Sequence, residues 1–151
     1  MQDKLEQEIS KYPVIEEFRV QWNHMDSANH VNNTIYLRWC ESVRIAYFAA
    51  IGMDISFTGE EVGPILGWQD CKYIFPLTYP DVAICGARVI EFKEDRFIME
   101  CAVFSQTHQR IAAISNQSIV PYDYKNLKKS SIPKSWLDSI SKLEKEVLSL
   151  T

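Results

Sequence analysis

Six polar side chains of the kinds that do chemistry lie within ten residues, directly ahead of a strongly apolar segment. They are His24, Asp26, Asn29, His30, Asn32 and Asn33. The carboxylate of Asp26 is suited to act as a general base or as a nucleophile, and the imidazole of His30 to move protons or to orient a neighbour. The sequence therefore predicts that the chemistry of this protein lies in the polar corner formed by residues 24–33.

The apolar segment from Thr34 to Ile51 is predicted to be a helix, and its burial decides where the polar corner points. Its apolar residues recur at steps of three and four and also cover most of the remaining surface, as in a core helix. Gly52 is the expected stop signal. The first amides of such a helix have no partners within it, and the helix dipole places roughly half a positive charge there. A group outside the helix must therefore satisfy these amides.

Two interpretations of the helix start follow. In one, Asn29, Asn32 or Asn33 caps the helix, as Asn commonly does. In the other, the open amides face an oxyanion that develops during a reaction, and Asp26 lies close by as base or nucleophile. The spacing alone favours the cap.

The stretch from Trp22 to Tyr36, read together with Glu41 and Arg44, resembles the signature of hotdog-fold acyl-coenzyme A (acyl-CoA) thioesterases of the 4-hydroxybenzoyl-CoA thioesterase type. That signature has Asp, any residue, Asp, two variable residues, Gly-His-Val-Asn-Asn, and then a Tyr three positions further on. The resemblance implies the hotdog fold, an α+β fold in which an antiparallel sheet of about five strands wraps around one long central helix. A C-terminal helix is expected in addition.

The resemblance also implies roles for individual residues. The second signature Asp is the catalytic carboxylate of the family, and it falls on Asp26, as general base or nucleophile. The oxyanion donor of the family is a backbone amide at the helix start, which falls near Asn33. His30 is expected to orient the corner through hydrogen bonds, while Asn32 and Tyr36 are expected to bind substrate. No metal or other cofactor is implied.

Two positions depart from the signature. The first signature Asp is His24 here, and the signature Gly is Asn29. Asn is the residue other than glycine that best tolerates a left-handed backbone, so the corner is expected to keep its shape. His24 either replaces a structural hydrogen bond or changes the charge beside Asp26, and with it the reaction.

The predicted function is hydrolysis of an acyl-CoA thioester to the free acid and CoA. One alternative is a hydratase or dehydratase of the same fold, with His24 and Asp26 as acid and base. Another is an acyl-thioester binding protein in which the change at His24 has disabled turnover. A metal site made of His24, Asp26 and His30 is disfavoured because the usual zinc spacings are absent. Glu41 is a reserve carboxylate, better explained as an ion-paired helix residue.

Composition narrows the class of protein. The 151 residues are predicted to form a single domain, with an N-terminal arm at 1–13 and a linker and C-terminal helix at 122–151. The net charge of −4 argues against nucleic acid as the main partner.

The longest apolar run, Ile45–Met53, is too short to span a bilayer, and the polar start has no signal-peptide pattern. The four cysteines form no Cys-x-x-Cys pair and are predicted to be reduced thiols of a cytoplasmic protein.

Five segments have the length of β-strands and are bounded by turn-forming residues. The short turns between the last four predict an antiparallel meander. They are Val14–Trp22, Ile65–Phe75, Val82–Phe92, Arg96–Ser105 and Arg110–Pro121. Asp54–Pro64 is predicted to be a loop. Aromatic residues such as Tyr73 and Phe75 are expected either to line an acyl pocket or to pack in the core.

Tyr122–Ser135 is predicted to be a solvated, lysine-bearing linker, with contact to the phosphates of CoA as the alternative. The helix that follows from about Pro133 carries an apolar stripe, so it is expected to pack on the sheet or on a partner subunit. The resemblance implies that two subunits join their sheets edge to edge and build the site across the interface. The expected partners are therefore acyl-CoA and further copies of the chain, in a dimer or tetramer.

Overall fold

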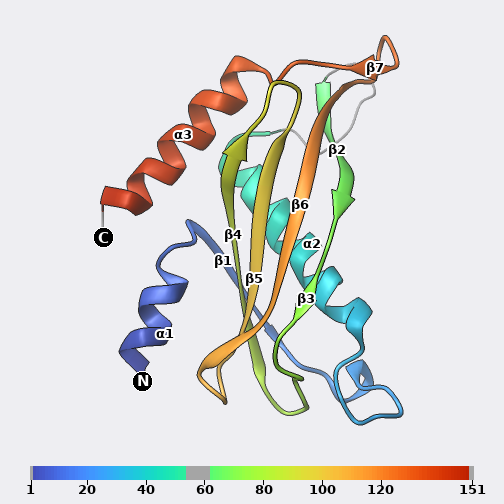
Figure 1. The fold of residues 1–151 in the computed structure, drawn as a ribbon, viewed down its shortest axis with the longest axis vertical. Helices are drawn as coiled ribbons and strands as arrows, with labels where there is room; N and C mark the ends of the chain where they lie inside the picture. Colours follow the sequence, from blue (N-terminus) through green and yellow to red (C-terminus); the bar gives the residue numbers. More distant parts are fainter. Residues whose placement is uncertain (1, 54–61, 150–151) are drawn as a thin grey trace.

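One long helix, α2 (Asn33–Ala50), lies against the concave face of a curled antiparallel sheet in the computed structural model, which describes residues 2–53 and 62–149 (Figure 1). The observed bounds agree with the predicted helix to within one residue at each end. Gly52 follows with a φ of 73°, the left-handed conformation expected of a glycine that ends a helix. Ile45 is 39% exposed, so α2 is buried along one face and not all round as predicted.

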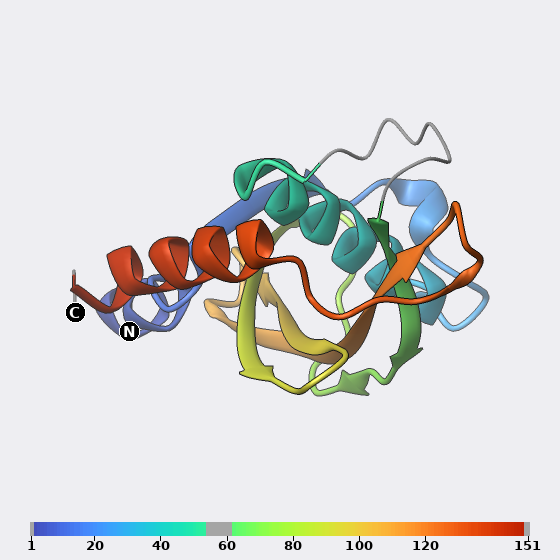
Figure 2. The same ribbon diagram turned by 90° about the horizontal axis from the view of Figure 1, so that it is seen from above.

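The described residues form seven strands in one antiparallel sheet, whose main order is β1-β4-β5-β6-β2, with the short strands β3 and β7 both paired to β6. The strands are β1 Val14–Arg19, β2 Val62–Gln69, β3 Lys72–Tyr73, β4 Val82–Phe92, β5 Phe97–Ser105, β6 Arg110–Asp123 and β7 Lys128–Lys129. An extra residue in β4 beside Val89, and another in β6 opposite Val103, are bulges that bend the strands. The sheet therefore curls around α2 (Figure 2), which confirms the predicted hotdog fold.

The predicted meander is correct for β4, β5 and β6 and wrong for β2. β2 pairs with β6 at one end of the main order, whereas β4 pairs with β1 and β5. Residues 74–81 therefore cross the end of the curled sheet. Leu77 anchors this crossing, because it is fully buried and both of its backbone groups are bonded. Its amide donates to the hydroxyl oxygen of Tyr36 (2.9 Å), and its carbonyl accepts from the amide of Val31 (2.9 Å).

The first two predicted strands differ most from the structure in their bounds, whereas those at 96–105 and 110–121 differ by one or two residues at one end. The first ends at Arg19 instead of Trp22, because its partner β4 begins at Val82 and offers no ladder beyond Arg19. Trp22 instead starts a short 3-10 helix, η1 (Trp22–His24), and is 70% exposed. The predicted strand Ile65–Phe75 is divided into β2 and β3, with a break at residues 70–71. Residues 54–61 of the predicted loop lie outside the described residues, and residues 62–64 belong to β2.

The remaining helices pack on the sheet. α1 (Gln2–Ile9) and Tyr12 after it form a small second core on the outer face, where Leu5 and Tyr12 join Ile84 and Phe104. α3 (Lys134–Ser149) lies beside β4 (Figure 1) and confirms the expectation that it packs on the sheet. The predicted linker ahead of it contains the end of β6 and the whole of β7. No helix among the described residues is long and apolar enough to cross a membrane.

Candidate active site

The polar corner is a small, internally bonded loop between η1 and α2. Met25 and Val31 form an antiparallel bridge that closes it. Inside, the amide of Asp26 donates to the carbonyl of His30 (3.0 Å), and the amide of Asn29 donates to the carbonyl of Asp26 (3.0 Å). Asn29 has a φ of 61°, so it adopts the left-handed backbone that was expected of an Asn in the place of the signature glycine.

The side chain of Asp26 is exposed and held in one orientation. Its Oδ1 accepts a hydrogen bond of 2.9 Å from the amide of Ala28, which is the local turn that Asp side chains commonly make. Among the described residues no donor contacts Oδ2. This oxygen is therefore available to water or to a ligand.

The start of α2 combines the two interpretations that the sequence left open. Asn32 is the N-cap: its Oδ1 accepts from the amide of Thr34 (2.9 Å) and from the Thr34 hydroxyl (2.8 Å). The first amide of the helix, that of Asn33, has no hydrogen-bond acceptor within the part of the chain that the structure describes. One residue thus caps the helix while its neighbour leaves a donor open at the positive end of the helix dipole.

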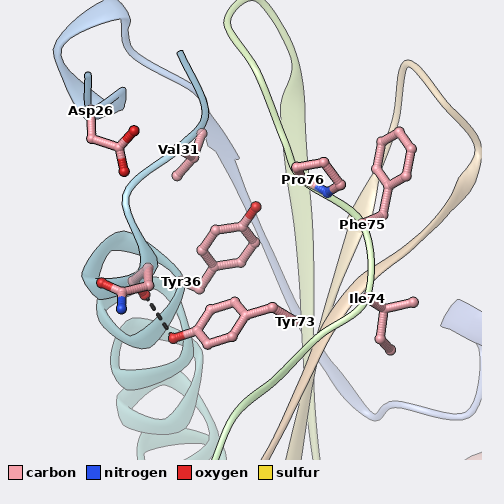
Figure 3. Close-up of a pocket in the computed structure, with 8 residues that line it drawn as sticks. Asp26, Val31, Tyr36, Tyr73, Ile74, Phe75 and Pro76 are labelled. Atoms are coloured by element: carbon pink, nitrogen blue, oxygen red, sulfur yellow. Dashed lines mark hydrogen bonds between the residues drawn. The ribbon is translucent and has the colours of Figure 1, made fainter. Parts of the chain in front are cut away.

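A pocket of about 400 Å³ lies between the corner, the start of α2 and residues 73–76 (Figure 3). Its walls are Asp26, Val31, Asn33, Tyr36, Tyr73, Ile74, Phe75 and Pro76. The pocket brings together three of the predicted site residues, Asp26, Asn33 and Tyr36. His30 and Asn32 are not part of its walls. His30 is exposed, and it holds the corner through its backbone carbonyl, without a hydrogen bond to its imidazole among the described residues.

Two tyrosines connect the sheet to the helix start inside this pocket. The hydroxyl of Tyr73 donates to the carbonyl of Asn33 (3.0 Å), and the rings of Tyr73 and Tyr36 meet edge to face at 5.2 Å. Burial raises the pKa of Tyr36, and it raises that of Tyr73 to about 12, so both hydroxyls stay protonated near neutral pH. Sequence reasoning named both tyrosines as possible pocket residues but had no signal for these contacts, since Tyr73 and Asn33 lie 40 positions apart.

His24 has a structural place beside the pocket. Its Nδ1 accepts a hydrogen bond of 2.9 Å from the amide of Gln21, and its ring packs edge-on against Trp39 at 5.8 Å. Burial lowers the pKa of His24, which favours the neutral imidazole that can accept this bond. His24 does not line the pocket with Asp26. Its geometry therefore fits a structural hydrogen-bonding role better than the role of an acid–base partner of Asp26.

The other candidate groups are separate from the pocket. The described residues include no group of three or more His, Cys, Asp or Glu side chains placed to hold a metal ion. Glu41 is exposed, and its carboxylate lies 3.9 Å from the guanidinium of Arg44, one turn further along α2. The ion-paired role predicted for Glu41 agrees with this contact.

Comparison with protein families gives one match that spans the site. A model of the thioesterase-like superfamily matches residues 20–140, which include the corner, α2 and every wall residue of the pocket. No curated protein matches the sequence.

Solved structures share the fold at low sequence identity. A thioesterase from Thermus thermophilus, complexed with coenzyme A and Zn, has a TM-score of 0.79 at 24% identity, over 89% of this chain and 96% of that chain. A 1,4-dihydroxy-2-naphthoyl-CoA thioesterase from Synechocystis has a TM-score of 0.77 at 15% identity, over 87% and 97%. A DHNA-CoA thioesterase from Staphylococcus aureus has a TM-score of 0.76 at 14% identity, over 91% and 95%.

Proposed function

The chain belongs to the thioesterase-like superfamily and is a thioester hydrolase, and from this premise we propose that it cleaves an acyl-CoA to the free acid and CoA. The observation that carries the proposal is that Asp26 lines the same pocket as Asn33, whose amide has no acceptor among the described residues. A carboxylate supplies the base or nucleophile that thioester hydrolysis requires, and a free amide supplies a donor for the oxyanion. Water is the only co-reactant.

The amide of Asn33 acts on the carbonyl oxygen of the thioester. Negative charge develops on this oxygen when the carbonyl carbon becomes tetrahedral, and the helix dipole adds to the stabilisation. A single donor of this kind is worth about 3 kcal/mol of barrier. Asn32 contributes by capping the helix, because the cap fixes the first turn from which the Asn33 amide projects.

Asp26 acts on the other side of the carbonyl group. As a general base, its free Oδ2 takes a proton from water while the water oxygen bonds to the carbonyl carbon. Collapse of the tetrahedral intermediate then breaks the carbon–sulfur bond, and the CoA thiolate leaves and takes up a proton. As a nucleophile, Asp26 would itself bond to the carbonyl carbon, expel the thiolate and be released by water. The carbonyl of His30 holds the Asp26 backbone in place for either course.

The substrate class rests on the fold and on the pocket walls. The Thermus thermophilus thioesterase of the same fold is complexed with coenzyme A, which supports acyl-CoA as the substrate. The Synechocystis relative acts on an aromatic acyl-CoA according to its name. Tyr36, Tyr73 and Phe75 give this pocket aromatic walls as well.

We also propose that the protein works as a dimer or tetramer. β2 ends the main strand order, so its outer edge has no strand partner among the described residues. Leu66 and Trp68 on this strand are 38% and 55% exposed. A second pocket of about 350 Å³, which includes Leu66 and the buried Arg44, lies between β2 and α2. Light scattering at micromolar concentration checks the proposal, and a monomeric mass would contradict it.

The four cysteines are free thiols in the structure. Free, mostly buried thiols support a reducing compartment, and we propose the cytoplasm.

Thiol release from a panel of short, long and aromatic acyl-CoA substrates tests the proposed function, after subtraction of the four protein thiols. The key variant is Asp26→Asn, because Asn retains the Oδ1 that accepts from Ala28. We expect its kcat to fall by at least about a hundredfold. Asp138→Asn is the matched control, since it makes the same change at an exposed carboxylate of α3 that lines neither pocket, and it should keep the native rate.

Other outcomes would assign another function. Tight binding of acyl-CoA without thiol release identifies a binding protein, and addition of water to an enoyl-CoA identifies a hydratase. Full activity of Asp26→Asn would contradict the role of Asp26. Label in the Asp26 carboxylate after repeated turnovers in ¹⁸O-labelled water would identify Asp26 as the nucleophile, because a general base forms no bond to the labelled oxygen.

A further inference from the structure

The hydroxyl group of Tyr36 is held by a bond that does not use its proton. Tyr36 is only 3% exposed, and its oxygen accepts a hydrogen bond of 2.9 Å from the amide of Leu77. A phenol is both donor and acceptor, so this bond occupies a lone pair and leaves the O–H free to donate. Among the described residues no acceptor receives that O–H. A buried donor of this kind is costly unless a ligand or water completes it.

The free O–H belongs to the wall of the pocket that contains Asp26. Tyr36 lines this pocket together with Asp26 and Asn33. In Figure 3 the hydroxyl points toward the gap between Val31 and Pro76 and away from Tyr73. Tyr36 therefore brings a hydroxyl donor to a pocket that is also lined by Asn33, whose amide has no acceptor among the described residues.

The tyrosine ring is fixed in this direction by its neighbours. It meets Tyr73 edge to face at 5.2 Å and Trp39 at 5.6 Å. The amide that holds its oxygen comes from Leu77, which is fully buried and whose carbonyl is bonded to Val31. Donors that are fixed before the substrate arrives stabilise a developing charge without the cost of reorganisation.

We propose that the hydroxyl of Tyr36 is a second donor to the thioester carbonyl oxygen, and that it acts together with the amide of Asn33. This inference rests on the proposed thioesterase function and deepens it, because it assigns a catalytic role to a residue of the pocket wall. The carbonyl oxygen then receives two hydrogen bonds, one from the helix start and one from the side chain a turn further along. Loss of one such donor typically lowers kcat on the order of a hundredfold.

Infrared spectroscopy of a bound substrate tests the inference without turnover. The probe is acyl-CoA with a ¹³C-labelled carbonyl, bound to the Asp26→Asn protein, and each hydrogen bond to the carbonyl lowers its stretching frequency. We expect a clear downward shift that becomes smaller in the protein that carries both Asp26→Asn and Tyr36→Phe. An equal shift in both proteins, or no shift in either, would overturn the inference. Either result can be obtained even if the native protein hydrolyses no thioester.

Kinetics with an acidic tyrosine separates donation from support of the fold. Replacement of Tyr36 by 3,5-difluorotyrosine lowers the pKa of the hydroxyl and retains the oxygen that accepts from Leu77. If Tyr36 donates to the substrate, kcat falls once the fluorinated hydroxyl ionises, whereas native kcat does not fall at that pH. If Tyr36 only accepts from Leu77, ionisation makes it a better acceptor, and an unchanged kcat would refute the inference. Native turnover in the same assay shows separately whether the proposed function holds.

Discussion

The hydroxyl of Tyr73 donates a hydrogen bond of 3.0 Å to the backbone carbonyl of Asn33, which lies 40 positions earlier in the chain. This bond joins β3 to the first turn of α2. The same residue lines the pocket, and its amide has no acceptor within the described part of the chain. The sheet therefore helps to set the direction in which that amide points.

Tyr73→Phe removes this connection without changing the ring. We expect the free energy of unfolding to fall by about 1 kcal/mol, the usual worth of one hydrogen bond. We also expect kcat for thioester hydrolysis to fall by up to about a hundredfold, because a small displacement of a donor has large effects on rate. Tyr79→Phe is the matched control, since Tyr79 is exposed to a similar degree and its hydroxyl makes no hydrogen bond among the described residues. A loss of stability with native kcat would contradict the positioning role.

The left-handed backbone at Asn29 predicts opposite results for two substitutions. Asn29→Gly should leave stability close to native, because glycine adopts a φ of 61° without strain. Asn29→Ala should lower the free energy of unfolding by about 1 kcal/mol, because its Cβ disfavours this conformation. Thermal unfolding and kcat of the two variants check this. Equal behaviour of Gly and Ala would show that the corner does not depend on this conformation.

Glu144 connects α3 to the rest of the fold through one oxygen. Its Oε1 accepts from the hydroxyl of Tyr47 (2.6 Å) and from the amide of Val89 (2.7 Å). Glu144→Gln keeps an oxygen for both donors, whereas Glu144→Ala leaves both donors unbonded in a partly buried site. We expect Ala to lower the free energy of unfolding by about 1–3 kcal/mol and Gln to change it much less at neutral pH, as measured by denaturant unfolding.

The same pair of proteins has a predicted pH dependence. Burial raises the pKa of Glu144 in the folded state, although Tyr47, the Val89 amide and Arg88 oppose the shift. The folded protein therefore holds the Glu144 proton more tightly than the unfolded chain does. The stability that this provides is complete below the ordinary carboxyl pKa and is lost as the pH rises through the raised pKa. Glu144→Gln should thus gain stability relative to native as the pH rises above the ordinary carboxyl pKa.

Gly86 makes room for Tyr12 on the outer face of the sheet. A Cβ at position 86 would lie 2.6 Å from Cγ of Tyr12, whose hydroxyl donates to Glu100 (2.6 Å). Gly86→Ala should therefore displace Tyr12 and lower the free energy of unfolding by about 1–3 kcal/mol. Tyr12→Ala removes the clash, so the double variant should be more stable than the sum of the single effects predicts. If the two effects are additive, Gly86→Ala lowers stability by some route other than the clash with Tyr12.

Several features were predictable because they depend on residues close together in the chain. The apolar periodicity gave the bounds of α2 to within one residue, and β4 occupies its predicted range, Val82–Phe92. Asn29 in a left-handed conformation and an Asn cap at the helix start follow from the preferences of that side chain. Asp26 and Asn33 lie near each other because one short loop connects them.

The pocket itself depended on contacts that the sequence does not display. Tyr73 reaches the helix start because β3 pairs with β6, and Pro76 lies on the segment 74–81 that crosses the end of the sheet. The expected meander places β2 beside the wrong strand. Strand pairing is decided by which arrangement buries α2 and Leu77 best, and that is a property of the whole fold. The sequence by itself determined the local chemistry of the corner, through side-chain preferences and hydrogen bonds over a few residues. Only the tertiary structure decided which tyrosines meet that corner, because such contacts join residues about 40 positions apart.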